Sequence, residues 1–251
     1  MVLTNEQIEE GFWSHLQING RVPKPVNYLD EYQEGAFINI VCTQLSISDY
    51  QQKKLVNQWV NRIPEMDHIR YLWFSSRVNQ ALFDAACKIH HLKGLYIKWS
   101  GIKDLSNLAN LKNLKYLHIG SSPSVESIDV FSKMSQLIVL QIENFKRIRE
   151  LSPLRSLSQL EGLAIEGSMW NAQIVDSLEP LSDLQNLRYI FLANLRSLDE
   201  TLEPLTRLKK LRNIRTTFKW TKSEFQLLRE SLPELKYGTP FQTELIDQFS
   251  K

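Results

Sequence analysis

The chain has 251 residues, of which 43% are hydrophobic and 23% charged, with nine glycines, nine prolines and a formal net charge of +2. This composition is typical of a folded globular protein and excludes collagen-like and disordered chains. A net charge so close to zero argues against general nucleic-acid binding. The length allows one or two domains with a large buried core, so size alone requires neither disulfides nor a structural metal.

The amino terminus reads MVLTNEQIEEGFWSHL, which is acidic where a secretory signal would be basic and then uniformly apolar. No apolar run approaches the roughly 18 residues of a membrane-spanning helix. Cys42 and Cys87 are the only cysteines, and they lack the spacing of a zinc site or a disulfide framework. We therefore expect two reduced core thiols, no export signal, no membrane association and a cytoplasmic location.

Leucines are distributed unevenly: residues 1–62 contain five of the 37 and residues 63–251 contain 32. Most follow an LxxLxL pattern that recurs in HLKGLYIKW, NLKYLHIGS, QLIVLQIEN, QLEGLAIEG, NLRYIFLAN and KLRNIRTTF, at steps of 22 to 27 residues. A less regular unit starts at Ile69, and Leu235 starts a final stub. Intervening segments such as IRELSPLRSL place an apolar residue at every third position. This pattern predicts short strands alternating with tight helical or 3-10 turns, stacked around one core.

These motifs resemble the leucine-rich repeat family, in particular its short repeats of about 22 to 24 residues, as in internalins and phosphatase regulators. The resemblance covers about residues 63–236. It implies an α/β solenoid with a curved parallel sheet on its concave side and short helices or 3-10 turns on its convex side. The family usually has asparagine eight residues after the first leucine, where this chain has Ser100, Ser122, Phe145, Ser168, Leu195 and Lys219. We expect the serines to replace part of the missing hydrogen bonding.

The ends of such a solenoid need caps, because an open end exposes apolar side chains. Residues 1–62 are predicted to form an N-terminal capping region, with a helix over 4–16, a strand over 36–42 and a helix over 46–63. The last two elements resemble an elongated first repeat. Residues 63–236 carry about seven repeats and the stub, and residues 237–251 form a C-terminal tail. Helices are also expected over 78–89 and over 221–233, the latter capped by Thr221 or Ser223.

The chain contains no GxGxxG, P-loop, GxSxG, HExxH or CxxC motif, and its five histidines lack metal-ligand spacing. Glu143 and Glu166 occupy the same place in successive repeats and are expected about 5 Å apart on neighbouring strands. On an open sheet we expect both carboxylates to stay hydrated, as an acidic spot on a binding face and not as an acid-base pair. We therefore expect no enzymatic activity, no cofactor and no metal site.

The residues between the leucines form columns on the concave sheet, because alternate side chains of each strand face away from the core. Aromatic residues gather on the early and the late repeats, with a small acidic strip between them. Exposed Trp and Tyr are enriched at interface hot spots, so these columns predict a protein-binding site. Its residues are Tyr71, Trp73, Tyr96, Lys98, Trp99, Tyr116, His118, Gln141, Glu143, Glu166, Tyr189, Phe191, Arg215 and Phe218.

The expected function is a protein-protein interaction module that acts through this concave face. Two alternatives for the aromatic columns stay open: the rings stack and only shield the sheet, or the chain's own tail covers them. Two alternatives for the function also stay open: an inhibitor or immunity protein that neutralises an enzyme, and a structural subunit of a larger complex or homo-oligomer. A basic stretch over 206–222 suits an anionic partner, but a solvated surface explains it as well. The partner's identity does not follow from the sequence.

Overall fold

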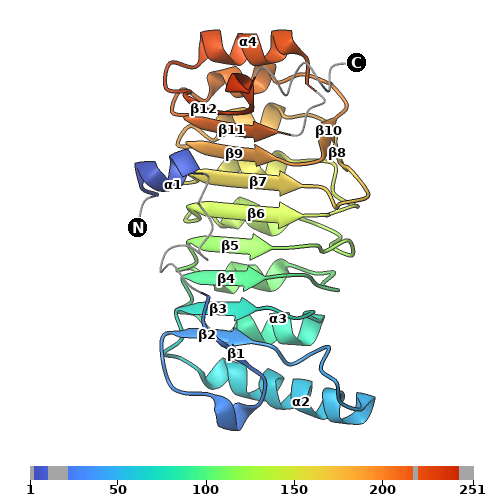
Figure 1. Ribbon diagram of the computed structural model, residues 1–251. Coiled ribbons are helices and arrows are strands. Elements are labelled where there is room, and N and C mark those ends of the chain that lie inside the picture. Colours follow the sequence, from blue (N-terminus) through green and yellow to red (C-terminus); the bar gives the residue numbers. More distant parts are fainter. Residues whose placement is uncertain (1–2, 11–21, 217–219, 243–251) are drawn as a thin grey trace.

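The computed structural model describes residues 3–10, 22–216 and 220–242, whose strands stack along one axis as the rungs of a solenoid (Figure 1). All neighbouring strands run parallel. In sheet order they are β1 (Pro25–Val26), β2 (Phe37–Ile40), β3 (Tyr71–Phe74), β4 (Gly94–Ile97), β5 (Tyr116–Ile119), β6 (Val139–Glu143), β7 (Gly162–Glu166), β9 (Tyr189–Leu192), β11 (Asn213–Thr216) and β12 (Tyr237–Gly238). A second, two-stranded parallel sheet pairs β8 (Gln173–Val175) with β10 (Leu195–Ser197). The predicted α/β solenoid is confirmed.

The return arms lie behind the sheet and change from full helices to 3-10 turns along the chain (Figure 1). The early repeats use α2 (Asp49–Arg62) and α3 (Gln80–Ala86). The later ones use 3-10 helices, in which three residues per turn place the triplet-spaced leucines on one inward side. These are Ser106–Asn110, Asp129–Lys133, Ser152–Ser156, Glu179–Asp183 and Glu203–Arg207, and further 3-10 turns span Leu29–Glu31, Ile63–Glu65 and Thr239–Phe241.

Near one end of the solenoid, β2 and α2 form the predicted elongated first repeat, and β1 pairs with β2 as the edge strand. β2 pairs in register with β3, and α2 is capped by Ser48, whose hydroxyl accepts a hydrogen bond from the backbone of Gln51. The apolar side of α2, including the fully buried Trp59, packs onto the core. The other end carries α4 (Lys222–Ser231), which is capped by Thr221, one of the two caps expected.

The core is one continuous cluster that runs from Ile38 to Leu235 and is built largely from the repeated leucines. Cys42 and Cys87 lie in it as free thiols, as expected. Burial raises the pKa of the Cys42 thiol to about 12 and also raises that of Cys87, so both are inert at neutral pH. None of the helices in the described ranges is long and apolar enough to cross a bilayer.

Serines at the asparagine position of the repeats bond in part, as expected. The hydroxyls of Ser100 and Ser122 lie 2.6 Å apart and are buried. Asn144 and Asn194, each one residue before the asparagine position of its repeat, also contribute hydrogen bonds. Both adopt positive φ angles, of 57° and 46°, which asparagine tolerates better than most residues. The Asn194 amide donates to the carbonyl of Ser168 at 2.8 Å.

The N-terminal helix is not at the end of the solenoid. Of the helix predicted over 4–16, the structure describes α1 (Asn5–Glu10), and the later residues lie outside the described part. Figure 1 shows α1 against the opposite face of the sheet from α2 and α3, near the starts of β7 and β9. The apolar side of α1 packs on this face of the sheet and not at the end of the solenoid, since Ile8 is fully buried there. At the other terminus, β12 extends the sheet into the region predicted as a tail, and residues 243–251 lie outside the described part.

Candidate functional site

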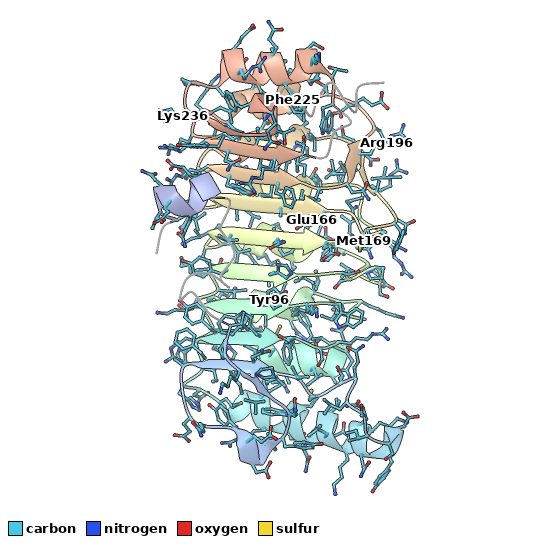
Figure 2. The ribbon with its side chains drawn as sticks, viewed as in Figure 1. Tyr96, Glu166, Met169, Arg196, Phe225 and Lys236 are labelled. Carbon is cyan, nitrogen blue, oxygen red and sulfur yellow. The ribbon has the colours of Figure 1, made fainter. Side chains whose placement is uncertain are left out.

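The predicted columns form with the expected register on the face that Figures 1 and 2 present to the reader. One column aligns Trp73, Tyr96, His118, Gln141, Ala164, Phe191 and Arg215 across successive strands. The next aligns Tyr71, Gly94, Tyr116, Val139, Gly162, Tyr189 and Asn213. Figure 2 shows Tyr96 and Glu166 on this face, so residues from distant repeats share one surface.

The expectation that the site residues face solvent is wrong for four of them. Trp73, Tyr116, His118 and Tyr189 are only 1%, 2%, 8% and 2% exposed. Those with intermediate exposure are Tyr71, Tyr96, Gln141, Glu143, Glu166 and Phe191, and those exposed are Lys98, Trp99 and Arg215. Phe218 lies outside the described residues. The binding site of the sequence analysis is thus much more enclosed than an open sheet would be.

Part of this enclosure comes from rings that stack on one another across strands. The rings of Tyr96 and His118 have centroids 4.3 Å apart and planes inclined by 28°. Phe37 and Tyr71 stack with centroids 4.9 Å apart and planes inclined by 6°. Phe37 was missed in the sequence because its strand, β2, lies outside the LxxLxL repeats, although AFINIVC shows the alternation of a strand. The shielding alternative therefore describes the geometry of these rings.

Glu143 and Glu166 form the central acidic pair, directly opposite each other on β6 and β7. Burial raises the pKa of both carboxyl groups, and the charge of Glu143 raises that of Glu166 further. Gln141 donates to Glu166 at 2.6 Å, which offsets part of this rise. Neither carboxylate forms a salt bridge among the described residues. The expectation of two fully hydrated carboxylates is therefore wrong, because half-burial leaves both short of solvation.

His118 lies beside this pair and is held neutral. Burial lowers the pKa of its imidazole to about 4, although a hydrogen bond with Gln141 opposes the shift. Burial also raises the pKa of the Tyr96 phenol, and the charge of Glu143 adds to that rise. At neutral pH this surface therefore presents a stacked aromatic pair and two carboxylates that no described residue pairs in a salt bridge.

A second part of the face is covered by the N-terminal strap, which we define as residues 3–10. Leu3 and Ile8 of the strap pack in one apolar cluster with Tyr116, Ile138, Val139, Ala164 and Tyr189. The N-terminal strap thus accounts for the burial of Tyr116 and Tyr189. The sequence left open coverage by the C-terminal tail instead, and it placed the N-terminal residues in a cap. The polar residues that hold the strap are Glu161, Arg188, Arg212 and Asn213.

Sequence reasoning missed these four polar residues. Glu161, Arg188 and Arg212 each come directly after the first leucine of a repeat, one position before a strand starts. That place is occupied by basic residues in several other repeats, so the exceptional Glu161 was the available signal. The register brings all three to the same edge of the sheet.

In the basic stretch over 206–222, of which the structure describes 206–216 and 220–222, several basic side chains are directed to separate partners. Arg207 forms an ion pair with Glu179, whereas Arg212 faces Glu9 at 3.5 Å. Lys209 donates instead to the carbonyl of Ser231 at 3.0 Å. Several of its charges are thus directed to separate local partners, which fits the solvated-surface interpretation.

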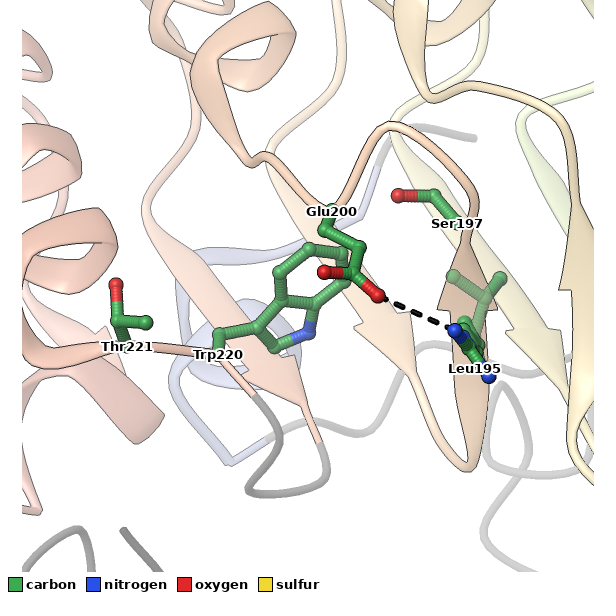
Figure 3. Close-up of a pocket in the computed structure, with 6 residues that line it drawn as sticks. Leu195, Ser197, Glu200, Trp220 and Thr221 are labelled. Atoms are coloured by element: carbon green, nitrogen blue, oxygen red, sulfur yellow. Dashed lines mark hydrogen bonds and ion pairs between the residues drawn. The ribbon is translucent and has the colours of Figure 1, made fainter.

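A cavity of about 300 Å³ lies away from the predicted columns, between β10 and the start of α4 (Figure 3). Its lining residues are Leu195, Arg196, Ser197, Glu200, Trp220 and Thr221, none of which belongs to the predicted site. Across the described residues, no cluster of three or more His, Cys, Asp or Glu side chains has the arrangement of a metal site.

Comparison with known proteins identifies the repeats. A family model described as a leucine-rich repeat region matches residues 55–244. No curated protein sequence matches the chain significantly.

Solved structures share the fold at low sequence identity. Internalin C2 from Listeria monocytogenes is 24% identical, with a TM-score of 0.50 over 70% of this chain and 72% of the internalin. A leucine-rich repeat protein from Leptospira interrogans is 15% identical, with a TM-score of 0.53 over 70% of this chain and 50% of its own length. At these identities the likeness establishes the solenoid alone.

Proposed function

The chain belongs to the leucine-rich repeat family, whose solenoids are generally protein-interaction modules, and from this premise we propose that it is a non-enzymatic protein that binds a protein partner through its concave face. The partner contacts the surface around the central acidic pair, flanked by Tyr96 and Trp99. We also propose that it acts in the cytoplasm, in keeping with its two free, buried cysteines.

One observation carries this proposal: Glu143 and Glu166 lie side by side, half-buried and with raised pKa values, without a salt bridge among the described residues. Such a pair loses hydration without gaining a counter-charge. A lysine or arginine from a partner would supply that charge, and Arg in particular can bond two carboxylates at once.

Trp99, which follows β4 two strands away from Glu143 on β6, supplies an apolar anchor. It is 42% exposed, and Tyr96, three residues earlier in the chain, is half-buried. Interface energy concentrates in such aromatic residues when a partner desolvates them. The expected partner segment therefore combines a basic side chain with an apolar or aromatic one.

The test is capture of partners from a lysate of the source organism on the immobilised full-length chain. It compares wild type with a Glu143→Gln/Glu166→Gln variant and a Tyr96→Ala/Trp99→Ala variant. The matched control is Trp170→Ala, which removes an 86% exposed tryptophan from the loop after β7. Circular dichroism checks that each variant folds.

We expect a protein that is retained by wild type and by the control but falls about 30-fold in affinity with Tyr96→Ala/Trp99→Ala, since truncating a hot spot costs about 2 kcal/mol. The Glu143→Gln/Glu166→Gln variant should weaken the same protein most at low salt, because the lost attraction is electrostatic. Equal retention by all four chains would contradict the proposed surface.

A further inference from the structure

The N-terminal strap is a short segment packed on repeats that are distant in sequence, since Leu3 and Glu161 are 158 residues apart. We call the surface beneath it, formed by Tyr116, Ile138, Val139, Ala164 and Tyr189, the groove. Its helix α1 has six residues, too few to be stable alone in water. Thr4 caps it: the backbone N–H of Gln7 donates to the Thr4 hydroxyl at 3.1 Å, and the Gln7 side chain accepts from Thr4 N–H at 2.9 Å. The strap therefore stays helical through this cap and through the groove.

Apolar anchoring depends on two side chains. Leu3 is 4% exposed and Ile8 is 0% exposed, whereas the intervening Thr4, Asn5 and Glu6 are exposed. The groove beneath them is apolar and contains Tyr116, Ile138, Val139, Ala164 and Tyr189. The groove thus accommodates two apolar side chains five residues apart in the bound segment.

Polar recognition is directed mainly at the backbone of the strap. Arg188 donates to the carbonyl of Leu3 at 2.6 Å, and Glu161 accepts from the amide of Leu3 at 3.2 Å. Asn213, which is fully buried, donates to the carbonyl of Ile8 at 2.8 Å. Backbone contacts of this kind accept any peptide that follows the same path.

Two side chains of the strap also receive polar contacts: Arg188 donates to the side-chain oxygen of Asn5 at 2.5 Å, and the contacts with Glu9 favour an acidic peptide. Arg212 faces the Glu9 carboxylate at 3.5 Å, and Tyr237 donates a hydrogen bond to the same carboxylate. Arg212 reaches its other acidic partner, Glu234, only at 4.0 Å. A carboxylate at the position of Glu9 is therefore the charged feature that the groove selects.

The polar residues of the groove stand on the repeats themselves. Glu161 and Arg188 form an ion pair at 3.2 Å, and both stand on the regular repeat scaffold. Their side chains are only 13% and 18% exposed with the strap in place. A rigid set of charged and apolar groups aimed at a short peptide has the character of a binding site and not of a core.

We propose that this groove recognises an acidic amphipathic peptide of a partner protein, and that residues 3–10 occupy it as a tethered competitor. The peptide has the pattern of LTNEQIE: a leucine, a helix cap, an isoleucine five residues after the leucine and an acidic residue next. This inference rests on the proposed function, because it assigns a second contact to the same concave face.

The experiment uses the peptide MVLTNEQIEE with a fluorophore at its C-terminus, titrated into full-length chains and followed by fluorescence anisotropy. One chain is wild type and the other carries Ile8→Asp, which places a charge where Ile8 is fully buried and so releases the strap. Two control peptides carry Ile8→Asp and Glu6→Lys. Circular dichroism shows that both chains are folded.

We expect saturable binding to the Ile8→Asp chain and at least tenfold weaker binding to wild type, because a tethered strap competes at an effective concentration of about millimolar. The Ile8→Asp peptide should not bind, whereas the Glu6→Lys peptide should bind as well as the parent. Adding Arg188→Met to the Ile8→Asp chain should reduce binding at least tenfold. Three outcomes would each contradict the proposed peptide-binding groove. They are no binding of the parent peptide to the Ile8→Asp chain, equal binding of the parent peptide to both chains, and binding of the Ile8→Asp peptide as tight as that of the parent.

The partner half of the inference is tested in the capture experiment above. An excess of the parent peptide should release the captured protein, and the Ile8→Asp chain should retain more of it than wild type does. A partner that is captured yet indifferent to both changes would overturn the tethered competitor and leave the proposed function standing. Peptide binding without any captured partner would overturn the proposed function and leave the groove.

Discussion

Two regions of the concave face lie on the same sheet, but their side chains are covered by different groups. Around β4 to β7, polar and aromatic side chains contact each other, through the Tyr96–His118 stack and the hydrogen bond from Gln141 to Glu166. At the starts of β7, β9 and β11, the N-terminal strap covers the sheet. The repeat thus determines where a side chain stands but not what lies against it.

Replacing two tyrosines of one column, Tyr189 under the strap and Tyr71 on β3, should show most clearly what the strap adds. Tyr189→Ala removes a ring that is 2% exposed beneath the strap and should lower the free energy of unfolding by about 3 kcal/mol. Tyr71→Ala, in the same column but half-buried, should cost less than about 1.5 kcal/mol. Urea unfolding of both variants measures the difference. Equal losses would show that the strap adds nothing to the packing of Tyr189.

The central region should respond to acid through His118. Its pKa is lowered to about 4 in the folded chain, so the unfolded chain takes up a proton below about pH 6.5 that the folded chain does not. Wild type should therefore lose about 2 kcal/mol relative to His118→Gln between pH 7 and pH 5. Urea unfolding at the two pH values gives this difference. A variant as acid-sensitive as wild type would show that folding does not lower the pKa of His118.

The strap region should respond to Ile8→Asp by local release. The expected loss is about 1.5 kcal/mol, the transfer free energy of one buried apolar side chain, because the solenoid itself stays folded. Amide hydrogen exchange should accelerate over residues 4–10 and remain unchanged in β6 and β7. The matched variant Glu6→Ala, at an exposed position, should exchange like wild type. Accelerated exchange throughout the late repeats would instead make the strap part of the core.

The smallest effect is expected at the central acidic pair. Raised pKa values mean that the folded chain holds protons more tightly, so Glu143 and Glu166 destabilise it as the pH rises above about 4.5. Relative to wild type, Glu143→Gln/Glu166→Gln should gain on the order of 1 to 2 °C in Tm between pH 5 and pH 7. Differential scanning calorimetry at both pH values measures the gain. A loss over this interval would mean that a cation already pairs with the carboxylates.

The sequence predicts the solenoid and its columns because the leucine spacing repeats with little variation, and a strand's alternation then assigns every side chain to a face. Glu143 and Glu166, for example, stand opposite each other as expected. Their burial could not be predicted, since it depends on Gln141, Tyr96 and the surrounding rings. The docking of Ile8 was also beyond reach, because helical spacing shows that a residue seeks an apolar surface but not which one.

The central claim is that the concave face recognises a partner, and hydroxyl-radical footprinting of the captured complex tests it most directly. We expect oxidation of Tyr96 and Trp99 to fall on binding, oxidation of Leu3 and Ile8 to rise as the strap is displaced, and oxidation of Trp170 to stay unchanged. Unchanged oxidation of Tyr96 and Trp99 with protection confined to other surfaces would contradict that claim.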